Sequence, residues 1–543
     1  MNTIIVSDFH ICSGTNPITG LTSSLEDFTD DYDFEKFLNW LAERPEAPWH
    51  LILGGDMFDF QQVNDLPTLN EIKEFGLFVY AKDLKWSAKK QIKPKKKIYH
   101  YDDLKNLQNF DNSWCFETWK TGLGTEENAM KFKMHKVMEG HSVFFKALAG
   151  FLKKGNKITF LRGNHDVELA WPSIQEMIKN YCSQESGLDE NSIRQNLVFL
   201  PHYYYEEELL YIEHGQQGEA ETSLRHVYSP FIKPKDKTEK VIELDFSSFL
   251  MRYLMNQVES INPLSDNYRP RSRYFNWLIS EHPAQAVRVV AKALPKVLKL
   301  WKKFSHPGGV DEEATKNMEI MKKNAKLFGL PEQLAENLDK LKEIPTLTLG
   351  QSFVTKIIVK YILLAIAVLF VITIIFMPFF YFEWIALMNT AKGILGKAFF
   401  AALFTTALML ILALIVLLYF NFSEKRKDKK SFVKAKDLDA GPMPMFRKYA
   451  DTIHRELISH NKNVKYIVMG HTHYCDRYIT NPEYQYFNTG SWMFLFNLEE
   501  QVFRKSRTYS FFELVKDEGK LLSFDPVTKE VREVIVENKQ YSN

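Results

Sequence analysis

Cysteine is scarce in this chain, and its distribution excludes a zinc ribbon. The 543 residues contain four cysteines, Cys12, Cys115, Cys182 and Cys475, and no two of them are spaced as C-x-x-C. This spacing rules out a ribbon and argues against a disulfide framework. Free cysteines fit a reducing compartment.

Net charge is also low, at +2 for the whole sequence. So small a value gives no support for a nucleic-acid coat or a polybasic effector, and we expect no specific nucleic-acid binding. The first ten residues, MNTIIVSDFH, lack the charged region and long apolar stretch of a secretory signal. We therefore expect the N-terminal part to stay in the cytosol.

Five short apolar runs each end in polar residues that can bind a metal. They are residues 3–7, 50–53, 157–161, 209–212 and 466–469. Runs of this length rich in Ile, Val, Leu and Phe predict buried strands. Helical patterns lie between them, for example at residues 34–41 and 134–152. This alternation indicates an α/β layered fold, in which active sites gather at the carboxyl ends of the strands.

Two apolar segments, residues 361–382 and 398–422, contain no charged side chain. Each is long enough to cross the hydrocarbon core of a membrane, which needs about 20 helical residues. We therefore predict a two-helix transmembrane hairpin, with a buried hairpin inside a soluble domain as the alternative. Lysine-rich outer flanks predict an integral membrane protein with two spans, whose catalytic domain and both termini are cytosolic.

The hairpin divides the predicted catalytic domain. Its first part is residues 1–218, with an insertion at about 81–130 that carries the basic stretch 89–97, and its last part is residues 461–543. Between them we predict a mainly helical insertion at 219–355, the hairpin region at 356–422 and a basic juxtamembrane linker at 423–460. An amphipathic stretch at 288–304 either lies on anionic lipid or packs on the protein, so membrane lipids are an expected partner.

Five polar clusters follow the apolar runs in a fixed order. They are Asp8-x-His10, Gly55-Asp56-x-x-Asp59, Gly163-Asn164-His165-Asp166, His214-Gly215 and Gly470-His471-x-His473. Each cluster alone is weak evidence, but all five in this order, each after an apolar run, predict a metal site. Asp, His and Asn offer oxygen and neutral nitrogen ligands that suit Mn, Fe or Zn. Two ions about 3.5–4 Å apart need a shared ligand, and a carboxylate is the natural bridge. Gly55, Gly163 and Gly470 predict tight turns and close backbone approach.

This pattern resembles the calcineurin-like metallophosphoesterases, over residues 1–214 and 464–489. The resemblance implies a four-layer β-sandwich flanked by helices, and two divalent ions, Mn first, with Fe or Zn as alternatives. It implies that one ion is bound by Asp8, His10, Asp56 and His473, and the other by Asp56, Asn164, His214 and His471. It also implies that His165 contacts the phosphate and protonates the leaving group, and that Asp166 orients His165. Asp59 either supports these residues or forms a turn.

The predicted function is a membrane-anchored hydrolase of a phosphoester or pyrophosphate bond that uses metal-activated hydroxide. The preferred phosphorylated substrate is a lipid or a nucleotide-linked lipid, because an anchored enzyme meets such substrates at high effective concentration. More distantly, the chain is similar to bacterial UDP-diacylglucosamine pyrophosphatases, which typically carry arginine where His165 stands. Two alternatives stay open: a phosphodiesterase acting on a soluble nucleotide or other phosphodiester, and a membrane-bound scaffold of the same fold.

Overall fold

The computed structural model describes one unit of the chain, formed by Met1–Thr348 and Gly441–Asn538. The described residues are 1–80, 98–105, 122–233, 239–253, 256, 283–284, 310–348, 444–481, 484–493, 496–497, 502–503, 508–534 and 536. The basic stretch 89–97 and the amphipathic stretch 288–304 lie outside them.

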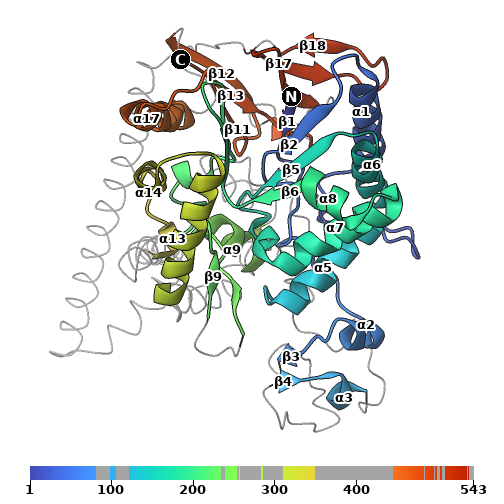
Figure 1. Cartoon of the computed structure of the whole chain (residues 1–543). Helices are drawn as coiled ribbons and strands as arrows, with labels where there is room; N and C mark the ends of the chain where they lie inside the picture. The colour runs from blue at the N-terminus through green and yellow to red at the C-terminus, as the bar shows by residue number, and fades with distance from the viewer. Residues whose placement is uncertain are drawn as a thin grey trace, which may run out of the picture. The chain divides into compact units, whose positions relative to one another are not determined.

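The first sheet has seven strands in the order β18-β17-β16-β1-β2-β5-β6 (Figure 1). Their bounds are β1 Asn2–Val6, β2 Trp49–Leu53, β5 Lys157–Leu161, β6 Leu197–Leu200, β16 Ser510–Val515, β17 Glu518–Phe524 and β18 Val531–Glu533. The neighbours β1, β2, β5 and β6 pair in parallel, whereas β16 is antiparallel to β1. The N-terminal strand is therefore central.

The second sheet has five strands in the order β12-β13-β11-β8-β7. Their bounds are β7 Tyr203–Glu206, β8 Leu210–Glu213, β11 Tyr466–Met469, β12 Cys475–Asn481 and β13 Tyr484–Thr489. Strand β11 is parallel to both β8 and β13, although β8 and β11 are far apart in the sequence. This pairing joins two segments that are distant in the sequence in one sheet.

Side chains of the central strands alternate between two apolar layers, as the pleat of a strand requires. In β1, Ile4 and Val6 belong to the core beneath the helices, whereas Ile5 belongs to a separate core. Ile212 and Phe487 of the second sheet pack in that separate core as well. The two sheets therefore pack face to face.

Helices cover the outer face of each sheet (Figure 1). On the first sheet they are α1 Asp31–Glu43, α5 Glu127–Gly140, α6 Ser142–Lys153 and α7 Pro172–Ser186; on the second they are α13 Val310–Leu327, α14 Glu332–Lys340 and α17 Pro444–Ser459. The described unit is thus mixed α/β with several sheets.

Shorter elements complete the unit. The helices are α2 Leu69–Glu74, α3 Tyr101–Leu104, α8 Glu190–Asn196 and α9 Phe246–Tyr253, with 3-10 turns η3 Val167–Ala170, η4 Gln216–Gly218 and η8 Thr346–Thr348. The paired short strands are β3 Val79–Tyr80 with β4 Ile98–Tyr99, β9 Phe231–Ile232 with β10 Val241–Ile242, and β14 Phe496–Asn497 with β15 Val502–Phe503. Helix α17 falls in the stretch predicted as a basic linker.

The predicted transmembrane hairpin is wrong, and with it the predicted fold class and the localisation with two spans. Among the described residues, no helix is long and apolar enough to cross a membrane. The predicted spans, residues 361–382 and 398–422, lie outside the described residues. The prediction depended on apolar length alone, and a helix that is apolar on all sides is compatible with a protein core as well as with a bilayer.

Helical spacing at residues 134–152 predicts one helix, but the structure has two, α5 and α6, separated at His141. The ring of His141 is buried between two acids. Its Nδ1 atom lies 3.0 Å from Asp31 Oδ2, and its Nε2 atom lies 3.1 Å from Glu26 Oε2. Burial alone would lower the pKa of His141, but the hydrogen bonds to Asp31 and Glu26 raise it to about 9 from 6.5.

This raised pKa predicts a pH-dependent stability. A protonated His141 stabilises the fold fully below about pH 6.5, and the stabilisation is lost as the pH rises through about 9. We expect His141→Asn to lower the free energy of unfolding at pH 6, with a gap to wild type that narrows towards alkaline pH. Urea unfolding of both proteins across this range measures the gap, and a gap independent of pH would contradict the assignment.

Candidate metal centre

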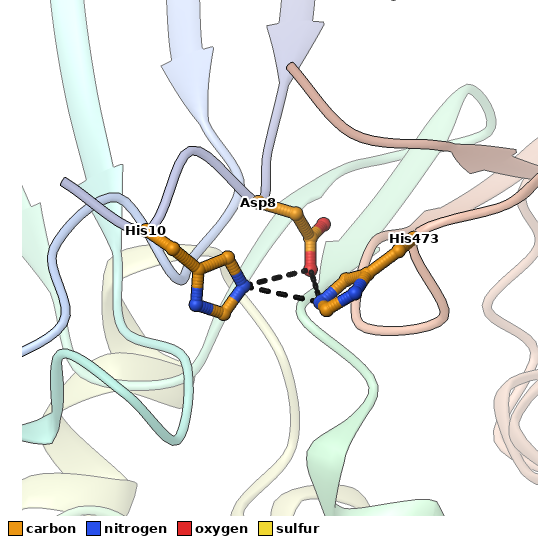
Figure 2. A group of neighbouring side chains, drawn as sticks. All are labelled: Asp8, His10 and His473. Carbon is orange, nitrogen blue, oxygen red and sulfur yellow. Dashed lines mark hydrogen bonds and ion pairs between the residues drawn. The ribbon is translucent and has the colours of Figure 1, made fainter. Parts of the chain in front are cut away.

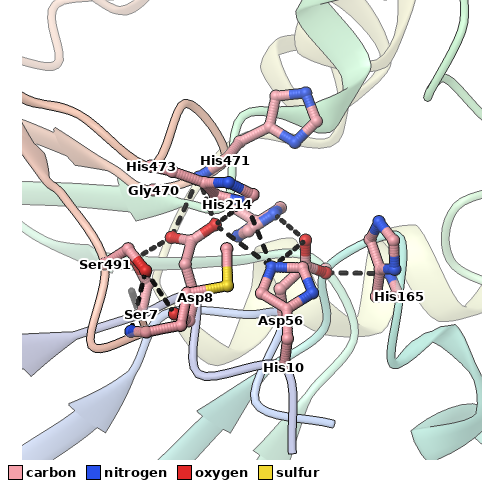
Figure 3. Close-up of polar contacts among 12 residues, drawn as sticks. Ser7, Asp8, His10, Asp56, His165, His214, Gly470, His471, His473 and Ser491 are labelled. Atoms are coloured by element: carbon pink, nitrogen blue, oxygen red, sulfur yellow. Dashed lines mark hydrogen bonds and ion pairs between the residues drawn. The ribbon is translucent and has the colours of Figure 1, made fainter. Parts of the chain in front are cut away.

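Both sheets direct the carboxyl ends of their parallel strands to one place, and the predicted site residues meet there (Figure 3). The residues that follow β1, β2, β5, β8 and β11 are, in that order, Asp8 and His10; Asp56 and Asp59; Asn164, His165 and Asp166; His214; and His471 and His473. All are buried. Residues from both ends of the chain therefore form one cluster.

The loops that carry these side chains have an unusual backbone. Asp8, His10, Asp56, His471 and His473 all have positive φ, between 52° and 70°. For residues other than glycine this left-handed conformation costs about 1–3 kcal/mol each, and such strain gathers at functional sites. Hydrogen bonds between the loops stabilise this left-handed conformation, since the amide N–H groups of Phe9 and His10 both donate to Asp56 O.

Asp8, His10 and His473 form the first group of potential ligands (Figure 2). His10 Nε2 lies 3.1 Å from His473 Nε2, and His473 Nε2 lies 3.4 Å from Asp8 Oδ1. Ligand atoms about 2.1 Å from one ion are roughly 3.0–3.4 Å apart in octahedral or tetrahedral geometry. Two of the three pairs therefore have the spacing of ligands to a shared ion, and the third pair, His10 Nε2 and Asp8 Oδ1, is wider at 4.0 Å.

Asp56, His214 and His471 form the second group. His214 Nε2 is 2.9 Å from Asp56 Oδ2, yet neither atom makes a hydrogen bond of good geometry within the described part of the chain. The side-chain amide oxygen and nitrogen of Asn164 also lack such a partner there. Buried polar atoms left unpaired are costly, and an ion between them would satisfy them. The residues thus fit a second ion.

Asp56 connects the two groups. Its Oδ2 atom faces His214 of the second group and lies 3.8 Å from His10 Nε2 of the first. Its other oxygen, Oδ1, accepts a hydrogen bond of 2.8 Å from His165 N. A carboxylate in this position can contact both ions, as the predicted bridging role requires.

Two glycines make room for the ligand carboxylates. A side chain on Gly163 would fall on Asp56 Oδ1, and a side chain on Gly470 would fall on Asp8 Oδ2 and Ser7 Oγ. Neither carboxylate could keep its place beside an alanine. Close approach of the backbone is thus part of how the centre is built.

The partner of His165 differs from the predicted one. His165 Nδ1 lies 2.8 Å from Asp59 Oδ2. Asp166 instead accepts hydrogen bonds from the backbone N–H groups of Gly163, at 2.6 Å, and Met57, at 2.8 Å. Asp59 is therefore placed to orient the imidazole, and Asp166 ties the loop after β5 to the loop after β2.

Burial and close charges shift the pKa values of the acids and histidines at this centre. Burial raises the pKa of Asp8 to about 6, and burial together with the charge of Asp56 raises the pKa of Asp166 to about 6. Burial alone would lower the pKa of His214, but Asp56 raises it to about 9. Burial would also raise the pKa of Asp56, but His214 and His165 hold it well below its usual range, and burial together with His10 lowers the pKa of His473. The acids and imidazoles of this centre therefore shift one another's ionisation strongly and in both directions.

Four residues around the centre were not found from the sequence. His471 Nε2 lies 3.2 Å from Glu219 Oε2 and 3.3 Å from Thr222 Oγ1. At the start of α9, Ser248 Oγ donates to Asn164 O at 3.2 Å, and buried Asp245 accepts from Ser248 N. These residues lie in the region treated as an insertion, where no motif or apolar run signals them.

Comparisons with protein-family models, with curated proteins and with solved structures found no match to this chain. The family resemblance therefore remains a prediction from the five motifs.

Two substitutions test the shared carboxylate. Asp56→Asn removes one negative charge, and Gly163→Ala displaces the carboxylate by steric overlap. Both substitutions should reduce the affinity for Mn²⁺ by about 10- to 100-fold or more. Changes to residues that support metal ligands have effects of this size. Metal analysis by mass spectrometry after equilibration with Mn²⁺ measures the bound ions. Asp189→Asn at the exposed start of α8 is the control. Wild-type metal content in both site variants would contradict the assigned centre.

Proposed function

We propose that this chain is a hydrolase of phosphoester or pyrophosphate bonds that depends on two divalent metal ions. The observation that carries the proposal is the pair of buried ligand groups joined at Asp56. The sequence motifs and the left-handed loop geometry support it. The predicted phosphorylated substrate follows from this chemistry.

The donor atoms are oxygens and imidazole nitrogens without a thiolate, which suits Mn, Fe or Zn. Asp8, His10, Asp56 and His473 would hold one ion, and Asp56, Asn164, His214 and His471 the other. When bound, such ions acidify water and withdraw electron density from phosphoryl oxygens. Glu219 and Thr222 both contact His471 Nε2, so they help to orient this imidazole.

His165 has the position expected of a general acid. It is buried beside the ligands, and its ring centroid lies 4.7 Å from that of His10. Asp59 holds Nδ1, so proton transfer to a leaving oxygen falls to Nε2. A carboxylate on the far nitrogen fixes the orientation of the ring and stabilises its charged form.

The substrate class follows from this acid. A group that donates a proton is most useful when the leaving oxygen is a poor leaving group, as in an alkyl ester. We therefore favour an alkyl phosphate ester as the substrate over an aryl phosphate ester, whose leaving group is good. The preference for a lipid depended on the hairpin, and it is not part of the proposal. The scaffold alternative is disfavoured because every predicted ligand and His165 are present at the centre.

Removing the general acid gives a specific kinetic pattern. His165→Ala should lower kcat about 10²- to 10⁴-fold on an alkyl phosphodiester, with bound metal unchanged. The loss should be much smaller on bis-p-nitrophenyl phosphate, whose leaving group needs no proton. Steady-state kinetics with both substrates measure this, with His135→Ala on α5 as the control. An equal loss on both substrates would contradict the acid role, and metal-loaded wild type inert on all esters would favour the scaffold.

Asp59 and Asp166 should behave differently in the same assay. Asp59→Asn should reproduce the leaving-group dependence of His165→Ala, because it releases the imidazole of His165. In the His165→Ala background, the same substitution should cause little further loss of kcat. Asp166→Asn should lower the thermal unfolding midpoint, because Asp166 holds two loops together, and should affect both substrates alike. Comparison of the two variants and of the double variant decides between them. The reverse pattern would restore Asp166 as the residue that orients His165.

A further inference from the structure

A cavity of about 480 Å³ lies at the edge of the first sheet, next to the loop after β5. It is lined by β6, the end of η3, the segment of Tyr228 and Phe231, and the C-terminal part of α13. Small-molecule sites commonly measure about 300–1,000 Å³. The cavity is therefore large enough for a ligand.

Most of its wall is apolar. Leu169, Phe199, Leu200 and Phe231 contribute to it. The Phe199 ring stacks on Phe160 of β5, with centroids 4.9 Å apart, and β6 is the last strand of its sheet. These contacts fix the aromatic side of the wall, so this side of the cavity is built in advance.

Arg162 is the buried charged side chain among the described lining residues. Its side chain is buried at 6% exposure, and within the described residues it forms no ion pair. Nη2 makes one long hydrogen bond to Tyr228 O, at 3.4 Å, and Nη1 has no partner in the described part of the structure. The buried Asp166 carboxyl acts on Arg162 electrostatically without forming an ion pair. A buried charge that lacks an ion-pair partner is destabilising, and a bound anion would supply one.

The rest of the charge at the cavity has the same sign. Lys323 and Lys326 of α13 line it and are exposed, and neither forms an ion pair within the residues that the structure describes. The described lining includes no carboxylate. A concave site with one sign of charge attracts ligands of the opposite sign.

We propose that this cavity binds an apolar molecule that carries one anionic group, with the anion on Arg162 and the apolar part against Leu169, Phe199 and Phe231. The site is separate from the metal centre, and the proposal does not depend on the proposed function. The two are nevertheless adjacent in sequence, because Arg162 directly precedes Gly163 and Asn164.

The test is calorimetric titration of the full chain with decanoate, decanol and decyltrimethylammonium, which share chain length and differ in charge. Decanoate should bind at least roughly tenfold tighter than decanol, and the cation weakest, since the charge pair supplies the difference. Ile320 lines the cavity from α13 and is partly exposed, so charged residues are tolerated there. Ile320→Glu should weaken decanoate binding, and the matched variant Ile320→Lys should not. Arg162→Met should also weaken it.

Each further outcome has a defined meaning. Equal affinity for decanoate and decanol, binding of neither, or identical binding by the two Ile320 variants would overturn the proposal. Asp56→Asn should bind decanoate like wild type. Loss of decanoate binding in that variant would place the ligand in the metal centre and would also overturn the proposal. If the wild-type protein binds decanoate but has no phosphoesterase activity, that result would count against the proposed function alone.

Discussion

The position of one carboxylate, that of Asp56, is the constraint on which the centre depends. Its backbone is left-handed, its Oδ1 accepts from His165 N, and its Oδ2 faces both ligand groups. The absence of a side chain at Gly163 leaves room for it. Asp56 O also accepts the amides that hold the loop after β1. Backbone strain and glycine placement in the surrounding loops keep this group beside both sets of potential ligands.

Much of the architecture near the centre could be predicted from local sequence. The runs at 157–161 and 466–469 coincide with β5 and β11, because a short apolar run between turn residues has few alternatives to a buried strand. The break between α5 and α6 could not be predicted, because it depends on His141 meeting acids distant in sequence. The prediction of the hairpin was wrong for a related reason. The length of an apolar segment reflects its amino-acid composition and does not show what surrounds the segment in the fold.

The candidate site likewise has some features that the sequence predicts and others that it does not. Spacing after each strand places the ligand side chains, since parallel strands bring their carboxyl ends together. Which carboxylate pairs with His165 depends on side-chain rotamers across two loops, so the motif alone favoured Asp166 over Asp59. Glu219 approaches His471 from a region without any local signal. Partner choice at this centre is a property of the tertiary structure, and buried Arg162 beside the same loop shows that charge balance there extends beyond the motifs.

The central place of β1 has a consequence for how the chain is made. Strand β1 ends at Val6, and its partner β16 begins at Ser510, about 500 residues later. At a synthesis rate of about 5–20 residues per second, the ribosome releases β1 roughly half a minute to two minutes before β16. During that time one edge of the future sheet has unpaired backbone groups, which are a template for wrong pairing. A nascent chain of this protein therefore has to keep one edge of its first strand from pairing wrongly until translation is almost complete.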